Sequence, residues 1–198
     1  EQLQRALVER PLHWVEQREQ LGTGHAVAQA LPFLPHDRLV LILYGDVPLL
    51  SEATLRRLLD AAESSGFALL TVCLTEPTGY GRIVRNSAGE IVRIVEQKDA
   101  SADELAIAEI NTGIMAVRGQ YLHRWLPALK NDNAQGEYYL TDCVAAAVAE
   151  GIRVVGVSAN DEVEVAGVNN RVQLAELERA WQRRRANALM EGGVTLLD

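Results

Sequence analysis

An apolar run that ends in a single carboxylate is the feature that most constrains this chain. Residues 39–43 are consecutive apolar residues, and the sequence YGDVP (44–48) follows at once. Such a run predicts a central parallel strand covered on both faces, and ligands bind these sheets outside the carboxyl ends of the strands. Gly45 permits a tight turn and Pro48 stops the strand, so we expect Asp46 at the sheet edge as a metal ligand. A polar turn that merely ends a core strand explains these residues equally well.

Length and composition predict one soluble α/β domain. The 198 residues are 48% hydrophobic, which suffices for a substantial core, and the net charge of −8 argues against a dedicated nucleic-acid surface. Cys73 and Cys143 lie far apart in apolar segments, so we expect core thiols in a reducing compartment. No apolar stretch reaches the roughly 18 residues of a membrane span, and the N-terminus does not resemble a signal peptide. We therefore expect a cytoplasmic protein with no membrane partner.

Strands and helices alternate along the sequence, with an antiparallel insertion in the middle. The pattern predicts a mixed, mostly parallel sheet flanked by helices. A hairpin is expected around NSAG (86–89), whose composition is typical of a turn. The predicted strands are residues 12–17, 39–43, 67–74, 80–85, 91–97, 110–117 and 152–157, and the predicted helices are 22–31, 51–64, 120–130, 140–150 and 169–190.

A glycine-rich turn precedes the helix predicted near residue 23. Gly22 and Thr23 belong to LGTGH (21–25), where unpaired backbone N–H groups suit an anion or the polar edge of a ring. Gln17 ends the preceding predicted strand and offers an amide donor and acceptor. Ordinary turn chemistry and surface polarity explain these three residues as well.

Polar residues at other strand and helix ends are further candidates for a binding site. Gly81 belongs to PTGYGR (77–82), in which two glycines permit close backbone approach to a ligand. Glu96 and Asn111 lie near the ends of neighbouring predicted strands and could bind sugar hydroxyls. Near the last two helices, Thr141 and Asn169 are N-cap candidates, although Asn169 could equally be a neutral metal ligand. No Ser or Cys with a convincing base, and no zinc-ligand spacing, is recognisable.

Seven segments, taken together and in order, resemble one enzyme family. They are LGTGHA, LYGDVPLL, TGYGRI, VEQKDA, EINTGIMA, NAQGEYYLTD and VEVAGVNNR. They resemble the uridylyltransferase domain of the bacterial bifunctional N-acetylglucosamine-1-phosphate uridylyltransferase/glucosamine-1-phosphate acetyltransferases. The resemblance implies a Rossmann-like nucleotide-diphospho-sugar transferase fold. It also implies that UTP and N-acetylglucosamine 1-phosphate are joined, giving pyrophosphate and UDP-N-acetylglucosamine for peptidoglycan and lipopolysaccharide synthesis.

The resemblance also implies roles for individual residues. Gln17, Gly22 and Thr23 would contact the uracil and the nucleotide, and Tyr44, Gly45 and Asp46 would line the nucleotide site. Asp46 and Asn169 would be the catalytic pair that binds Mg²⁺. The N-acetylglucosamine portion would be held by Gly81, Glu96 and Asn111, with Tyr139 and Thr141 beside it. Since a sugar phosphate is already ionised at neutral pH, the reaction needs no protein base.

Two departures from the family pattern give further expectations. Nothing in residues 1–20 matches the family's first strand and basic, glycine-rich loop, which cradles the triphosphate. We therefore expect a partial uridylyltransferase domain over residues 1–198, impaired in turnover, with an exposed edge on the 39–43 strand and a tendency to self-associate. Residues 171–191 would be the helix that links to the family's second domain, a β-helix acetyltransferase through which the family forms homotrimers. The alternatives are a non-catalytic sugar-nucleotide-binding or regulatory module, or a thymidylyl- or cytidylyltransferase.

Overall fold

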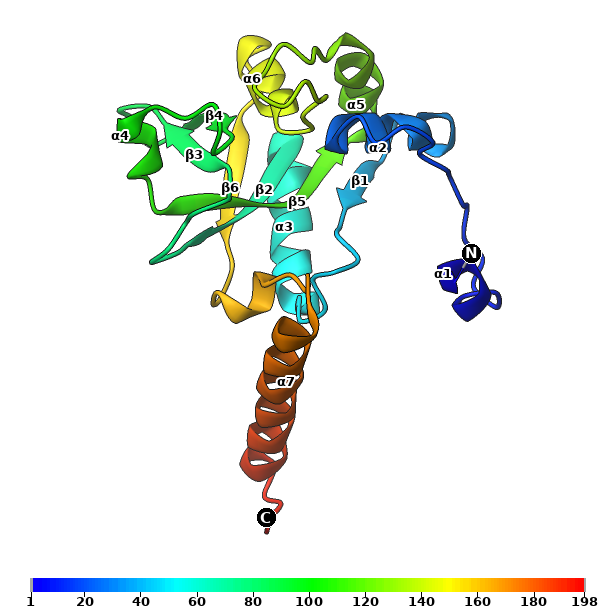
Figure 1. Cartoon of the computed structure of the whole chain (residues 1–198), viewed down its shortest axis with the longest axis vertical. Coiled ribbons are helices and arrows are strands. Elements are labelled where there is room, and N and C mark those ends of the chain that lie inside the picture. Colours follow the sequence, from blue (N-terminus) through cyan, green and yellow to red (C-terminus); the bar gives the residue numbers. More distant parts are fainter. Residues whose placement is uncertain (1, 198) are drawn as a thin grey trace.

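The computed structural model describes residues 2–197, which form a six-stranded mixed sheet with helices on both faces (Figure 1). The strands are β1 (Leu39–Ile42), β2 (Phe67–Cys73), β3 (Arg82–Arg85), β4 (Ile91–Val95), β5 (Glu109–Arg118) and β6 (Val154–Ser158). The helices are α1 (Gln2–Ala6), α2 (Thr23–Ala30), α3 (Glu52–Ser65), α4 (Ala102–Leu105), α5 (Gly119–Trp125), α6 (Asp142–Ala149) and α7 (Arg171–Glu191). Three 3₁₀ turns, η1 (Leu31–Phe33), η2 (Leu126–Ala128) and η3 (Val163–Val165), complete the assigned elements.

Strand β5 organises the sheet because three strands pair with it. The main path is β4-β3-β5-β2-β6, and β1 is a further partner of β5. The β2–β6 ladder is parallel, whereas β5 runs antiparallel to β1, β2 and β3, and β4 runs antiparallel to β3. The expected mixed sheet is thus present, with β1, β2, β3 and β6 pointing in one direction. Neighbouring strands are mostly antiparallel, because β5 lies between β1 and β2.

The two faces of the sheet bury different side chains of the same strand. Along β2, Phe67 and Leu69 pack with residues of α5 and α6, whereas Ala68 and Leu70 pack with Leu58 and other residues of α3. Since successive side chains of a strand point to opposite faces, burial on both sides requires the continuous apolar run that the sequence shows. The body of the molecule is therefore a helix–sheet–helix sandwich.

The helix α3 begins and ends where the local sequence requires it. Ser51 is the N-cap, and its hydroxyl accepts a hydrogen bond from the Thr54 backbone N–H. Gly66 ends the helix in the left-handed conformation at φ 87°, which glycine adopts without steric cost. The prediction for this helix is confirmed to within one residue at each end.

Strand β1 differs from its prediction as a buried central strand. All four of its residues are only partly buried, and Leu43 behind it is 49% exposed. Within residues 2–197, β1 pairs with β5 alone, so its other edge has no ladder, and the edge expected on this strand is present. The apolar run marks a strand correctly, but the sequence alone does not show which neighbours cover it.

Several other predictions are wrong in detail. Residues 12–17 are not a strand, because no described strand pairs with them. The helix expected over residues 120–130 stops at Trp125, where Pro127 converts the chain to the turn η2. Cys143 is buried as predicted, but Cys73 is exposed at the end of β2.

The two ends of the chain lie apart from the sandwich. In Figure 1, α1 stands away from the sheet on the right, and α7 extends from the bottom of the body to the C-terminus. Four apolar residues recur along α7, but only Leu177 is buried, since Leu174, Trp181 and Leu189 are 52%, 52% and 44% exposed. Within residues 2–197, no helix combines the length and the apolar content needed to cross a membrane.

Candidate functional site

The candidate site lies at a break in the edge of β5, between the strands β1 and β3. The ladder with β1 covers residues from Met115 to Arg118, and β3 pairs with β5 at Ile110. On the opposite edge, the register moves from Leu69↔Met115 to Thr71↔Asn111, so β5 bulges outward between these pairs. A bulge of this kind opens the ladder and redirects side chains.

Local hydrogen bonds fix the shape of the bulge. Gly113 has φ 82°, and its N–H donates to the side-chain oxygen of Asn111 at 3.1 Å. The Thr112 hydroxyl donates to the Leu70 carbonyl at 2.8 Å and accepts from the Ile114 N–H at 3.3 Å. The side chains of Asn111 and Thr112 thus satisfy backbone groups that a regular ladder would pair. The sequence signal was the pair of residues, Asn111 and Gly113, that interrupts an otherwise good strand.

A pocket of about 230 Å³ occupies this break and brings together half of the predicted site residues. The predicted residues that line it come from six segments of the chain. They are Thr23, Tyr44, Gly81, Glu96, Asn111 and Thr141. Residues far apart in sequence therefore share one concave surface, which is the arrangement expected of a small-molecule site.

Glu96 is the acidic group of the pocket. Its Oε1 accepts a hydrogen bond from the Thr141 hydroxyl at 2.9 Å. Burial raises the pKa of Glu96, the carboxylates of Asp142, Asp99 and Glu137 raise it further, and the Thr141 hydrogen bond opposes them. Thr141 is the N-cap residue of α6, as expected, but its side chain makes no cap hydrogen bond, because its hydroxyl donates to Glu96 instead.

Gly81 lies against Glu96 and is fixed to the bulge. The Asn111 N–H donates to the Gly81 carbonyl at 2.8 Å. A Cβ on Gly81 would lie 2.9 Å from Ile94 Cγ2 and 3.2 Å from Glu96 Oε2. The absence of a side chain here therefore leaves the Glu96 carboxylate accessible from the pocket.

Tyr44 covers the bulge from the end of β1. Its ring lies so close to Gly113 that a Cβ there would be 2.4 Å from Tyr44 Cε2. Partial burial raises the pKa of the Tyr44 phenol, with smaller contributions from Glu96 and Asp46. Gly45, the next residue, is exposed, and a Cβ added to it would meet no other group of the described residues within 4 Å.

The glycine turn before α2 is held against the segment that carries Thr141. The Gly24 N–H donates to the Tyr138 carbonyl at 2.8 Å, and the Thr23 hydroxyl accepts from the Leu140 N–H at 3.1 Å. Gly22 has φ 105°, and a Cβ there would lie 2.7 Å from the Tyr138 carbonyl oxygen. Close backbone packing therefore requires glycine at this turn.

Gln17 and Gly22 lie beside the pocket rather than in its wall. The Gln17 amide nitrogen donates to the Gly22 carbonyl at 3.1 Å and contacts His25 Nδ1 at 3.1 Å. Since a carbonyl can only accept, this contact fixes which end of the amide faces the turn. The Gln17 carbonyl oxygen has no hydrogen-bond partner among residues 2–197.

Asp46 and the segment before α7 lie together, as the proposed metal pair requires. The Val168 N–H donates to the Asp46 carbonyl at 2.9 Å, and a Cβ on Gly167 would lie 3.6 Å from Asp46 Oδ2. Asn170, not Asn169, caps α7, because its side chain accepts from the Val172 and Gln173 N–H groups. The capping explanation for Asn169 is therefore wrong, and its exposed side chain makes no cap hydrogen bond to α7.

The chemistry of this pair fits a hydrated divalent cation. Asp46 is exposed, and its carboxylate accepts no hydrogen bond within the described part of the chain. Among those residues there is no group of three or more His, Cys, Asp or Glu that could enclose a metal ion. Mg²⁺ accepts a site with one or two protein oxygens, since it retains several waters and binds substrate phosphates. One carboxylate and one amide suit such an ion.

Tyr139 also lies outside the wall of the first pocket. It lines a separate pocket of about 310 Å³, whose wall also includes Glu96 and Thr141. Its hydroxyl accepts from the Gln135 amide at 2.9 Å and donates to Asp99 Oδ2 at 3.5 Å. Tyr139 therefore supports the far side of the Glu96–Thr141 pair rather than lining the first pocket.

The sequence interpretation missed two buried charged residues. Glu164 is 1% exposed and accepts from the backbone N–H groups of Ser51 and Asn160, both at 3.0 Å. Arg82 is 2% exposed and follows Gly81 directly. Neither has a sequence signal of its own, because charged residues at strand or loop ends are ordinarily exposed.

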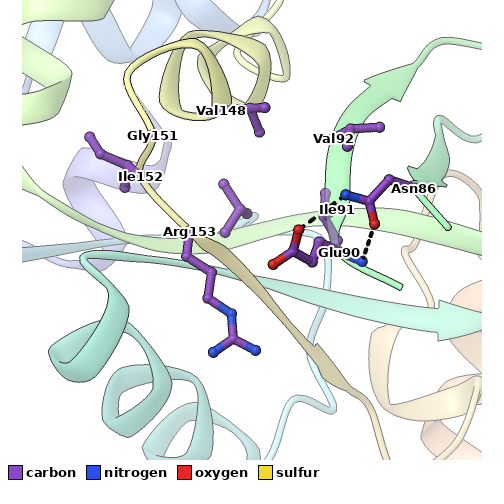
Figure 2. Close-up of a pocket in the computed structure, with 9 residues that line it drawn as sticks. Asn86, Glu90, Ile91, Val92, Val148, Gly151, Ile152 and Arg153 are labelled. Atoms are coloured by element: carbon purple, nitrogen blue, oxygen red, sulfur yellow. Dashed lines mark hydrogen bonds between the residues drawn. The ribbon is translucent and has the colours of Figure 1, made fainter. Parts of the chain in front are cut away.

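A further pocket of about 190 Å³ lies between β4 and the connection from α6 to β6 (Figure 2). Figure 2 shows Asn86 and Glu90 pointing toward each other, and the Asn86 amide donates to Glu90 Oε2 at 3.0 Å. Because Asn86 also accepts from the Ala88 and Glu90 N–H groups, it serves the hairpin turn. None of the predicted site residues lines this pocket.

Comparisons with known proteins show which sequences this chain is similar to. Residues 1–194 match the family described as "MobA-like NTP transferase domain". The chain is 57% identical over 198 residues to a protein of Idiomarina loihiensis named "Bifunctional protein GlmU", covering 100% of this chain and 43% of that protein. It is 59% identical over 195 residues to a protein of the same name from Burkholderia thailandensis, covering 98% and 43%. The chain thus spans less than half the length of these relatives.

Proposed function

We propose that this chain, which belongs to the MobA-like NTP transferase domain family, transfers uridylate to N-acetylglucosamine 1-phosphate. The products are UDP-N-acetylglucosamine and pyrophosphate. The single observation that carries this proposal is the pocket in the edge of β5, where Gly81, Glu96 and Asn111 converge beside Thr23 and Tyr44. The similarity to two bifunctional GlmU proteins supports the same assignment.

The pocket offers groups suited to a sugar. Glu96 uses Oε1 for Thr141, which leaves Oε2 beside Gly81 to accept a hydrogen bond from a sugar hydroxyl. Asn111 uses its side-chain oxygen for Gly113, which leaves its amide N–H groups for a carbonyl or hydroxyl oxygen. One acceptor just after β4 and one donor on β5 thus define the orientation of a polyhydroxylated ring.

The turn before α2 offers a selective partner for uracil. Since the Gln17 amide nitrogen donates to the Gly22 carbonyl, the side-chain oxygen of Gln17, which has no partner among residues 2–197, is left as an acceptor. Uracil carries an N3–H donor, whereas cytosine has a bare nitrogen at the same ring position. This arrangement supports uridine over cytidine nucleotides.

The residues of the chain act by positioning rather than by acid–base chemistry. A phosphate oxygen of the sugar phosphate attacks the α-phosphorus of UTP, a new P–O bond forms, and pyrophosphate leaves. The attacking oxygen is already ionised, so no side chain has to remove a proton. Asp46 and Asn169 would hold Mg²⁺, which neutralises phosphate charge when it is bound.

A comparison of nucleotides tests this proposal. UTP, TTP, CTP and GTP are each titrated into the chain by calorimetry with Mg²⁺ and N-acetylglucosamine 1-phosphate, and pyrophosphate release is measured in parallel. We expect UTP to bind at least about tenfold more tightly than CTP, the effect of one unpaired buried hydrogen-bonding group. Equal affinity for UTP and CTP would contradict the role of Gln17. A preference for TTP or CTP in both assays would favour the related thymidylyl- or cytidylyltransferases.

A non-catalytic role, in which the chain binds the nucleotide sugar without making it, is the second candidate. It is favoured by the pocket in the edge of β5, where Glu96 and Asn111 offer groups that bind a sugar. UDP-N-acetylglucosamine binding without pyrophosphate release in the same assay would support this second function.

A further inference from the structure

Arg82 is a buried cation without a carboxylate partner. It is 2% exposed at the start of β3, where it lies opposite Val95 of β4 and Ile110 of β5. Ion pairs join several other arginines to carboxylates, but none involves Arg82 within residues 2–197. A buried charge requires compensating polar contacts, so the partners of this guanidinium show what it does.

All hydrogen bonds of the guanidinium hold one wall of the pocket. Its Nη1 donates to the Tyr80 carbonyl, and its Nη2 donates to Gln97 Oε1 at 2.8 Å. The same Gln97 oxygen accepts from the Gly79 N–H at 3.2 Å. Arg82 and Gln97 therefore fix the backbone of residues 79–81, which lines the pocket beside Glu96.

This wall is held from its other side by the bulge of β5. Gly81 accepts from the Asn111 N–H at 2.8 Å, while Gly79 adopts φ 92°. Gly79 and Tyr80 are themselves exposed, so packing does little to define their conformation. The shape of the wall thus depends on hydrogen bonds. Arg82 donates one of them directly, to the Tyr80 carbonyl, and its second hydrogen bond holds the Gln97 side chain that accepts from Gly79.

Stability alone does not explain an arginine at this position. The Arg82 Nε is buried and has no hydrogen-bond partner among the described residues. An apolar side chain of similar length would fill the space without an unpaired donor. Lysine would not replace the arginine, because only the planar fork of a guanidinium reaches two separate acceptors in fixed geometry.

We propose that Arg82 is a positioning residue that holds the backbone of residues 79–81 in the shape that accepts the sugar of a nucleotide sugar. This inference rests on the proposed function, since it concerns the same pocket. It predicts that Arg82 contributes to binding of the sugar portion and contributes nothing to binding of the nucleotide portion.

Calorimetric titration of UDP and of UDP-N-acetylglucosamine into the whole chain separates the two portions. The dissociation constant of UDP divided by that of UDP-N-acetylglucosamine measures how much the sugar adds to the affinity. We expect Arg82→Met and Arg82→Lys each to reduce this ratio by about tenfold or more, with the UDP constant unchanged within about twofold, where tenfold corresponds to about 1.4 kcal/mol. Gln97→Ala, which changes a half-buried residue, is expected to reduce the ratio in the same direction.

Ile83→Val is the matched control. Ile83 is equally buried on the same strand, but it packs in the core that contains Phe67 and Leu69. It should lower Tm without changing the ratio. A wild-type ratio in Arg82→Lys or in Gln97→Ala, or an equal loss of UDP affinity in these variants, would overturn the inference. If Arg82→Met does not fold, Arg82→Lys and Gln97→Ala decide it. A wild-type chain that binds UDP and UDP-N-acetylglucosamine equally would overturn the proposed function and the inference together. If the wild type and the variants all prefer UDP-N-acetylglucosamine over UDP to the same degree, only the inference is overturned.

Discussion

Replacing Asp46 by alanine is expected to lower kcat/KM for UDP-N-acetylglucosamine formation by about 10²–10³-fold, the range for removal of one group that stabilises developing charge. Asp46 is the exposed carboxylate next to the segment of Val168 and Asn169. Without it, the proposed pair keeps only a neutral amide, which attracts a divalent cation weakly. Pyrophosphate release measured over a range of Mg²⁺ concentrations checks this, and the variant should need more Mg²⁺ to reach half of its own maximal rate.

Asp60→Ala is the control for the loss of one negative charge, because Asp60 is an exposed carboxylate on α3. It should leave both the rate and the Mg²⁺ dependence unchanged. An Asp46→Ala chain with the wild-type rate and Mg²⁺ dependence would remove Asp46 from the proposed metal pair. In that case the polar turn at the end of a strand would be the better explanation of this residue.

Replacing Glu164 by glutamine is expected to destabilise the fold by about 2 kcal/mol or more, since a buried hydrogen-bonded charge is lost. The two carboxylate oxygens accept from two different backbone N–H groups, Ser51 on Oε1 and Asn160 on Oε2. A glutamine must turn its NH₂ toward one of these donors. For a chain of this size, Tm should fall by roughly 4–8 °C.

The stability that Glu164 provides should depend on pH. Burial alone would raise its pKa, but the hydrogen bonds from Ser51, Thr54 and Asn160 outweigh burial and hold the pKa below its ordinary value. A carboxylate with a depressed pKa stabilises the fold fully above its unfolded pKa of about 4.3, and the effect is lost as pH falls through the folded pKa. The Tm difference between wild type and Glu164→Gln should therefore be largest near neutral pH and shrink below about pH 4.3.

Glu162→Gln is the control for this experiment, because Glu162 is an exposed neighbour on the same segment. It should change Tm little at any pH. A Tm difference for Glu164→Gln that is constant with pH would contradict the ionised state of Glu164. The Glu164→Gln variant also tests how the proposed metal pair is held in place. Glu164 lies in the segment that leads to Asn169, and it accepts a hydrogen bond from Ser51, five residues after Asp46.

Local sequence signals predicted the elements whose formation depends on nearby residues. Ser51 caps α3 and Gly66 ends it, and Asn86 and Gly89 form the hairpin turn between β3 and β4. These features require only short-range hydrogen bonds and a backbone conformation that glycine favours. The location of strand β1 followed from its apolar run for the same local reason.

Features that depend on distant partners could not be predicted in this way. Residues 12–17 have strand-like chemistry but no strand beside them in the described chain, and β1 is less covered than its sequence indicates. Thr141 is of a residue type that caps helices, but its hydroxyl donates to Glu96, which lies 45 residues earlier in the chain. Arg82 and Glu164 each have a hydrogen-bond partner in another segment, Gln97 for Arg82 and Ser51 for Glu164, and nothing in their own sequence neighbourhood indicates this.

The most direct test of the central claim is whether the pocket in the edge of β5 selects an N-acetylated sugar. UDP-N-acetylglucosamine, UDP-glucose and UDP are titrated into the chain by calorimetry, and each titration is repeated with Glu96→Ala. We expect UDP-N-acetylglucosamine to bind most tightly, and Glu96→Ala to reduce its affinity by about tenfold, the loss of one hydrogen bond to a charged group, while the affinity for UDP is unchanged. Equal binding of all three ligands, or a Glu96→Ala chain that still prefers UDP-N-acetylglucosamine to the wild-type degree, would contradict the account.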